Sequence, residues 1–245
     1  MIDVHAHLNH LNFSPEVCDR IIDNAKKAGY SGYIYPALGL HPVQTMMDKT
    51  ERSVNLDDYD QWEPTLKKAI TDKTICCVGE VGLDFSPHII RNNERNNPSL
   101  SEDELKDIQR EVFRRQINLA VAADLPVNVH SRSAGHHALT VLRECNAKRV
   151  IMHAFDGKPS YAKQAVTAGY HFSVPPSVVR SPQKQALVAA VPLSHLLLES
   201  DSPALGPEKG VDNEPANIIL AAEEIARIKQ ISVDEVVGFP GIFVP

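Results

Sequence analysis

The sequence alternates short apolar runs of strand length with stretches of helical periodicity. Five of the apolar runs end in a histidine or an acidic residue: 2–7, 75–80, 126–130, 149–153 and 195–201. Short buried strands alternating with helices are typical of parallel β–α–β units. In barrels of such units the functional groups stand at the carboxyl ends of the strands. We therefore predict an α/β fold, a TIM-type (β/α) barrel.

An open doubly wound sheet is the competing architecture. It would usually carry a glycine-rich phosphate loop, and the chain has neither a Walker A motif nor a well-placed G-x-G-x-x-G. The length of 245 residues suits one barrel, and no linker-like run divides it. We expect residues 1–245 to form a single domain.

Capping signals mark several helices between these runs. Ser14-Pro15 predicts a helix that ends near Gly29. A second is expected from Leu56 to Ile70, and the capping box Ser101-x-x-Glu104 opens a third that runs to about residue 120. Further helices are expected after residue 159 and over 183–190.

The first apolar run presents two histidines, His5 and His7, which share one face of a strand and can serve one metal ion. Together with the other run ends they predict a metal site, because histidine with carboxylate suits Zn, Mn or Fe, and an acidic bridge suits two divalent ions. The candidate ligands are His5, His7, Glu80, His130, His153 and Asp201.

Composition narrows the partners and the compartment. A net charge of −6 and a pI near 6.0 disfavour a broad grip on duplex nucleic acid. The four cysteines have no regular spacing, which predicts reduced, structural thiols in an intracellular protein of the cytoplasm or nucleus. We expect no membrane span and no leader ahead of residue 2, and the sequence predicts no protein partner.

Several motifs occur in order along the chain: Asp3-x-His5-x-His7, the segment 39–42 (GLHP), 79–84 (GEVGLD), 130–132 (HSR), 153–157 (HAFDG) and 199–203 (ESDSP). This series resembles the TatD-type metal-dependent deoxyribonucleases, which belong to the amidohydrolase-like metallohydrolases. The segments 127–135 and 202–209 are most similar to the third animal branch of that family.

The resemblance implies a function and a division of the ligands. His5, His7 and Asp201 would hold one metal, His130 and His153 a second, and Glu80 would bridge both. Two such ions, Zn, Mn or Mg, would activate a water to hydrolyse DNA phosphodiesters, with Glu80 and Asp201 catalytic and Asp201 the base. We expect a 3′ exonuclease that also nicks abasic sites, with DNA ends, single strands or lesions as partners.

Other polar residues have two interpretations each. Arg132 is expected to bind a substrate phosphate, or to form a salt bridge at the barrel rim. The family motif has His41 face the substrate phosphate, and the alternative is a capping role. Asp84 would hold a ligand histidine by its free N–H, or cap a turn, and Asp3 is expected to support the ligands from behind. His171 and His195 match no family ligand and are expected to be structural.

The chain departs from the family pattern in two places. Only one strand-like run lies in the 73 positions from His7 to Glu80, so the second strand and its helix are expected to be missing or merged with 29–32. At the other end, the glycines and prolines of 238–245 replace the family's last helix. Two alternative functions follow: a small-molecule hydrolase of the amidohydrolase type, or an inactive truncated variant.

Overall fold

The computed structural model describes residues 2–8, 14–29, 34–91 and 96–238. These residues divide into two compact units. The central unit holds 35–157 and 167–170, and the terminal unit holds 1–34, 158–166 and 171–245. Residues 30–33, which include all but the first residue of the segment 29–32 where we expected the second strand to be missing or merged, lie outside the described residues, as does the tail 239–245.

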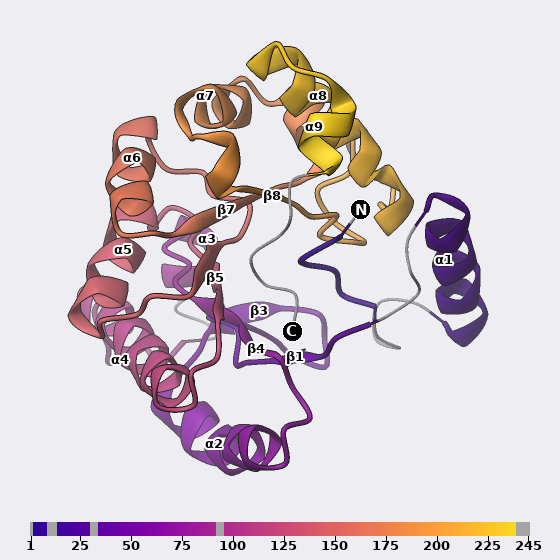
Figure 1. The fold of residues 1–245 in the computed structure, drawn as a ribbon. Helices are drawn as coiled ribbons and strands as arrows, with labels where there is room; N and C mark the ends of the chain where they lie inside the picture. Colours follow the sequence, from indigo (N-terminus) through magenta and orange to yellow (C-terminus); the bar gives the residue numbers. More distant parts are fainter. Residues whose placement is uncertain (1, 9–13, 30–33, 92–95, 239–245) are drawn as a thin grey trace. The chain divides into compact units, whose positions relative to one another are not determined.

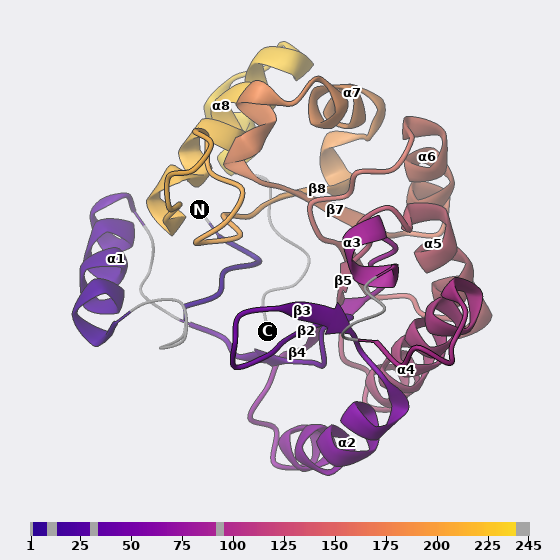
Figure 2. The ribbon, with the colours of Figure 1, turned by 180° about the vertical axis from the view of Figure 1, so that it is seen from behind.

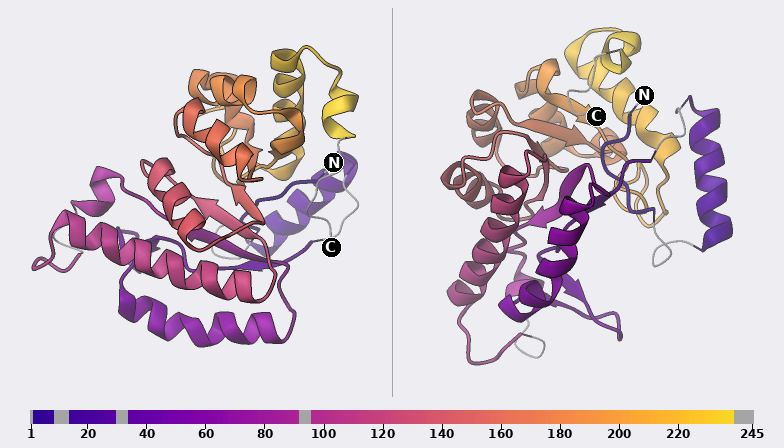
Figure 3. Two further views of the ribbon diagram at one scale, coloured as in Figure 1. Left: turned by 60° about the vertical axis from the view of Figure 1, so that its left-hand side comes forward. Right: turned by 60° about the horizontal axis from the view of Figure 1, so that its bottom comes forward.

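The central unit is a parallel sheet backed by helices. Its strands follow the order β1-β4-β5-β6, and Figure 1 shows β1, β4 and β5 side by side. The strands are β1 (Ala37–Leu38), β4 (Cys77–Gly82), β5 (Val127–His130) and β6 (Val150–Met152); the helices are α2 (Leu56–Thr71), α3 (Pro87–Ile90), α4 (Glu102–Ala122) and α5 (Gly135–Glu144). The left panel of Figure 3 shows α2 and α4 running beside each other.

Capping explains where the two long helices of this unit begin. Ser101 and Glu104 form the predicted reciprocal capping box at the start of α4. Asn55 and Asp58 form another at the start of α2, which the sequence analysis did not predict. A buried cluster joins α2 to the end of β1, with Trp62 packed against it. It consists of Leu40, Val54, Tyr59 and Val112.

An antiparallel hairpin, which the sequence did not predict, follows β1. Strands β2 (Val43–Thr45) and β3 (Glu51–Ser53) pair with Gln44 opposite Arg52. Figure 2 shows the hairpin near α3, and β3 contacts that helix. Because the hairpin starts two residues after His41, it adds structure directly beyond one of the predicted site residues.

The terminal unit pairs β7 (His171–Val174) with β8 (Leu196–Leu198) in parallel, with Ser173 opposite Leu197. Helix α8 buries Ile218, Ala221 and Ile225 and contacts β8. The helices of this unit are α1 (Pro15–Lys27), α6 (Pro159–Thr167, but for its last residue), α7 (Pro182–Ala190), α8 (Ile218–Lys229) and α9 (Val233–Val237), with 3₁₀ turns at Pro176–Arg180, Leu193–His195 and Pro215–Asn217.

The prediction of a strand over the first eight residues is wrong for the described part, 2–8. This segment is extended and donates Val4 N–H to the carbonyl of Leu198 at 3.0 Å, but it is no regular strand. Asp3 Oδ1 accepts the N–H groups of His5 (3.1 Å) and Ser200 (2.9 Å). The side chain therefore interrupts a backbone ladder that resumes where His7 N–H donates to the carbonyl of Ser202 at 2.8 Å.

Strands β4 and β5 approach each other closely at Gly82, the last residue of β4. Its φ is +148°, and a Cβ there would lie 2.0 Å from the carbonyl oxygen of His130. Gly82→Ala should therefore reduce the free energy of unfolding by more than about 3 kcal/mol, because β4 and β5 must separate. Denaturant unfolding measures this loss.

The matched control is Gly169→Ala. Gly169 has φ +82°, and a Cβ added there would meet no atom within 4 Å. The free energy of unfolding of this variant should fall by only about 1–2 kcal/mol, the cost of placing a residue with a Cβ in a left-handed conformation. Equal losses in the two variants would contradict the close approach of the strands.

Candidate metal centre

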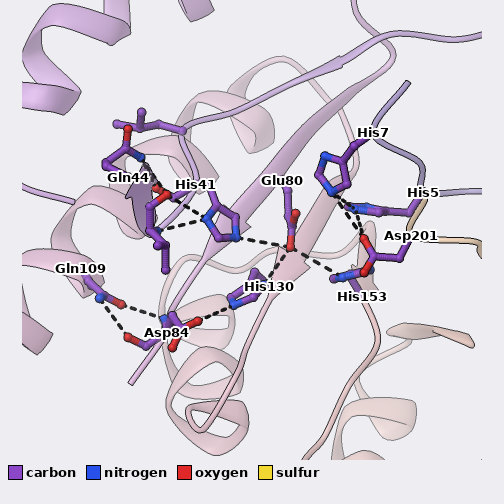
Figure 4. A network of polar contacts seen from close by, with 12 residues as sticks. His5, His7, His41, Gln44, Glu80, Asp84, Gln109, His130, His153 and Asp201 are labelled. Atoms are coloured by element: carbon purple, nitrogen blue, oxygen red, sulfur yellow. Dashed lines mark hydrogen bonds and ion pairs between the residues drawn. The ribbon is translucent and has the colours of Figure 1, made fainter. Parts of the chain in front are cut away.

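Three predicted ligands of the terminal unit meet in the structure. His5 Nε2 lies 3.0 Å from His7 Nε2, and Asp201 Oδ1 lies 3.3 and 3.4 Å from these two nitrogens. Figure 4 shows the three side chains pointing toward one another. The side chains of His5 and Asp201 are 7% and 9% exposed, whereas His7 is 37% exposed. One side of this cluster is therefore open to a solvent molecule or a substrate.

Asp3 fixes the two segments that carry these ligands. Its Oδ1 accepts the N–H group of His5, which is itself a candidate ligand, and the N–H group of Ser200, which precedes the candidate ligand Asp201. Asp201 N–H donates to the carbonyl of His5 at 2.9 Å, and Asp201 has φ +55°, a left-handed conformation that is uncommon for residues other than glycine. Asp3 thus supports the ligands through their backbone, and burial raises the pKa of its carboxyl to about 6 despite these hydrogen bonds.

A second cluster lies in the central unit around the carboxylate of Glu80. Glu80 Oε1 is 2.8 Å from His130 Nδ1, 3.6 Å from His41 Nε2 and 3.7 Å from His153 Nε2. Figure 4 shows these three rings arranged about Glu80. Because His41, Glu80 and His130 present ligand atoms within 4.8 Å of one another, the group could hold a metal ion.

The position of Glu80 on its strand differs from the prediction. We expected Glu80 to end the strand, but β4 continues to Gly82. The β4–β5 register shifts between Val78 and Val81, as in a β-bulge. A bulge re-aims the side chains beside it, which accounts for the Glu80 residue being slightly more exposed than the rest of β4, although its side chain is only 7% exposed.

Opposing electrostatic effects act on Glu80 and His130. Burial would raise the pKa of Glu80, but the charges of His153 and His41 and the hydrogen bond with His130 hold it well below its usual range. Burial likewise opposes protonation of His130, yet Asp84 and Glu80 raise the pKa of its imidazole to about 9. Both ring nitrogens of His130 face carboxylate oxygens, so without a metal both must donate.

Asp84 satisfies both of its predicted roles at once. Oδ2 lies 3.1 Å from His130 Nε2, and Oδ1 accepts the N–H of Ser86 at 2.8 Å, which caps the turn after β4. Burial works against ionisation, but these hydrogen bonds lower the pKa of Asp84 to about 2. A carboxylate on the far nitrogen of a ligand histidine fixes the ring and its protonation.

Arg132 and His41 are the residues predicted to bind phosphate. Arg132 is exposed two residues after β5, and within the described parts of the chain its guanidinium forms no ion pair. His41 Nδ1 accepts the N–H of Val43 at 3.1 Å, the contact that the capping interpretation predicts, while Nε2 lies 3.6 Å from Glu80 Oε1. The phosphate roles of Arg132 and His41 stay predictions.

Both clusters fit divalent ions by the chemistry and spacing of their donors. Two ligand atoms of a tetrahedral zinc ion, each bonded at about 2.0–2.1 Å, lie about 3.3 Å apart. The separations among His5, His7 and Asp201 are 3.0–3.4 Å, and those from Glu80 to its histidines are 2.8–3.7 Å. Imidazole with carboxylate is also the donor set that Zn and Mn accept.

Two histidines outside the clusters stack on each other. The rings of His171 and His195 lie 5.1 Å apart with an interplanar angle of 21°, in the terminal unit. Burial and the neighbouring His195 lower the pKa of His171. The four cysteines are free thiols. These contacts agree with the structural roles that the sequence predicts for these residues.

The sequence interpretation missed two polar residues behind the central-unit cluster, Gln109 and Gln116. Both are fully buried on α4, and they contact the backbone of Asp84 and Leu40. A signal was present: the two glutamines stand seven residues apart on the same face as the apolar residues that predicted the helix. Buried polar groups need hydrogen-bond partners, so glutamines on an apolar helix face indicate specific contacts.

Fold and donors together define the class: a metal-dependent hydrolase on an α/β barrel. A family model described as "TatD related DNase" matches residues 8–239. The chain therefore belongs to the TatD related DNase family, which confirms the predicted family and enzyme class. No helix in the described residues combines the length and apolar character needed to span a membrane.

Relatives and a solved structure agree with this assignment. Deoxyribonuclease TATDN3 of Homo sapiens is 44% identical, over 97% of this chain and 90% of the relative, which fits the third animal branch. The metal-dependent hydrolase YabD of Bacillus subtilis is 29% identical over 96% and 94%. The crystal structure of the TATD homolog YJJV from Escherichia coli shares the fold, with a TM-score of 0.74, 24% identity, and 98% and 94% coverage.

The human alignment extends over 260 positions, more than the 245 residues of this chain. The relative therefore has residues for which this chain has no counterpart.

The raised pKa of His130 predicts how metal binding depends on pH. Because a ligand nitrogen must be deprotonated, a metal that binds His130 displaces its proton at any pH below about 9. Mn²⁺ affinity should rise with pH, by about tenfold per unit where one proton is released, and level off near pH 9. Titration calorimetry in buffers of different ionisation enthalpy measures both the affinity and the protons released.

Asp84→Asn is the matched variant for this measurement. Loss of that carboxylate lowers the pKa of His130, so the pH at which the Mn²⁺ affinity stops rising should be lower. An affinity that does not change between pH 6.5 and 9 in the unaltered protein would contradict a role for His130 as a ligand.

Proposed function

We propose that this chain hydrolyses DNA phosphodiester bonds with two divalent metal ions. The observation that carries the proposal is the pair of clusters, each with histidine and carboxylate donors at metal-ligand spacing. Membership of the TatD related DNase family supports the choice of DNA phosphodiesters as the bonds. We further propose that residues 1–245 form one metallohydrolase domain in which both clusters serve one reaction.

The donor sets support a division of ligands. His5, His7 and Asp201 would hold one ion, and His130 and His153 a second, with Glu80 shared between the two. When bound, such ions polarise a phosphodiester and make water a nucleophile near neutral pH. Zn, Mn and Mg are the candidates, and the mixture of imidazoles and carboxylates favours Zn or Mn over Mg.

The chain's own residues would then orient the reactants. Asp201, with one oxygen beside His5 and His7, can orient the attacking water and accept its proton. Arg132 offers a planar pair of N–H donors to a nonbridging phosphate oxygen, and His41 is partly exposed beside Glu80 and can contact the same phosphate.

Charge bears on the form of the substrate. A net charge of −6 disfavours the broad basic face that long duplex binding requires. Recognition of one strand end or one lesion needs only a few phosphate contacts. We therefore propose 3′-exonuclease activity on single strands, with nicking at abasic sites, and a place inside the cell where DNA is found, the nucleus or the cytoplasm.

The alternative of an inactive truncated variant can be separated by stability and metal content. An intact single domain should unfold in one cooperative transition and bind two metals per chain. Broad unfolding with less than about one metal per chain would favour the inactive variant. Calorimetry together with elemental analysis of the purified protein measures both quantities.

Glu80→Ala is the first test of the proposed activity. With Mn²⁺ present, the unaltered protein should shorten single-stranded DNA, and the variant should lose at least about 10³-fold in rate because both ions lose a ligand and its negative charge. Gel analysis of a 5′-labelled oligonucleotide follows the reaction. Unchanged cleavage by the variant would contradict the proposal, and hydrolysis of cyclic amides but not DNA would favour the small-molecule hydrolase.

Arg132→Ala tests phosphate recognition. Loss of a charge-assisted hydrogen bond should raise KM for the oligonucleotide by about 10- to 100-fold, with metal affinity unchanged. Arg91→Ala is the control, because Arg91 is an exposed arginine of the central unit that pairs with Glu102. If both variants change KM equally, the effect is one of net charge and Arg132 has no special role.

A further inference from the structure

Gln109 and Gln116 of α4 each bind both polar groups of one backbone residue. Gln116 Oε1 accepts the N–H of Leu40 at 2.7 Å, and its Nε2 donates to the carbonyl of Leu40 at 3.1 Å. Gln109 makes the same pair of bonds with Asp84, at 2.8 and 3.0 Å. Each amide thus pairs with a peptide group as a neighbouring strand would.

The two residues that the glutamines bind, Leu40 and Asp84, lie just beyond the ends of two strands. Leu40 lies two residues beyond β1, and Asp84 two residues beyond β4. Both are buried, with 8% and 1% of their surface exposed. Buried N–H and C=O groups without partners are costly, so the glutamines supply hydrogen bonds that the sheet no longer provides.

The spacing of the glutamines matches the spacing of the strands. Seven residues are about two helical turns, which places both side chains on one face of α4 about 10 Å apart along its axis. β1 and β4 are neighbours in the sheet, so one helix face reaches the ends of two adjacent strands. Gln109 also donates to Ser53 Oγ at the end of β3 (3.0 Å).

Each of the two residues that the glutamines bind is directly connected to the cluster around Glu80. Asp84 contacts His130 Nε2 through Oδ2, and Figure 4 shows the path from Gln109 through Asp84 to His130. Leu40 precedes His41, whose ring faces Glu80. A packing role alone would be served equally by an apolar side chain of the same length, such as methionine.

We propose that Gln109 and Gln116 are positioning residues: Gln109 sets the orientation of His130 through Asp84, and Gln116 sets the placement of His41. The two glutamines therefore act on different properties of one site. Gln109 governs metal affinity, and Gln116 governs substrate binding. The second statement rests on the proposed role of His41 at the substrate phosphate, with His130 and His153, and not His41, as the histidine ligands of this cluster.

The test compares Gln109→Met with Gln116→Met at a temperature well below the unfolding midpoint of each. Gln109→Met should weaken Mn²⁺ binding by about 10- to 100-fold, the usual effect of losing support behind a metal ligand, with KM unchanged at saturating metal. Gln116→Met should keep the metal affinity and raise KM for the oligonucleotide. Ile117→Ala, which removes buried packing from the same helix, should change the unfolding midpoint alone.

Several outcomes would overturn the proposal. If both variants keep the metal affinity and the KM of the unaltered protein, the glutamines have a structural role only. If both variants change in the same way, α4 has loosened as a whole. If the unaltered protein cleaves no DNA, the proposed function fails, but crystal structures of the variants still decide: Gln109→Met should displace Asp84 and His130, and Gln116→Met only His41.

Discussion

A buried carboxylate, Glu80, is the constraint on which the central unit depends. Taking an ionised carboxylate out of water is costly unless charges or hydrogen-bond donors surround it. Here three imidazoles do so, and they come from the ends of β1, β5 and β6. The parallel order of these strands with β4 brings the rings together. In the metal-loaded protein, cations would take over the compensation that these imidazoles otherwise provide.

Much of this arrangement follows from local sequence. The alternation of apolar runs and helices predicts the parallel sheet, and the capping boxes at Ser101 and Asn55 fix where α4 and α2 begin. The ligand candidates His130 and His153 lie where predicted, at or just after the ends of β5 and β6. These features depend on residues close to one another in the chain, so their pattern is legible without a structure.

The features that were missed depend on partners far away in the chain. The first eight residues have strand-like composition, but Asp3 takes the N–H groups of His5 and Ser200 and breaks the ladder. Periodicity likewise places Gln109 on the buried face of a helix without indicating that it binds Asp84. The bulge that re-aims Glu80 depends on the pairing of β4 with β5, which no single run of residues reveals.

The central proposal is that the carboxylate of Glu80 is shared by two divalent metal ions. Electron paramagnetic resonance of the protein loaded with Mn²⁺ tests it most directly, because two ions that share a carboxylate are exchange-coupled. The account predicts a coupled spectrum at two Mn²⁺ per chain, which Glu80→Gln converts to the six-line spectrum of isolated ions. A six-line spectrum from the unaltered protein at full loading would contradict the claim.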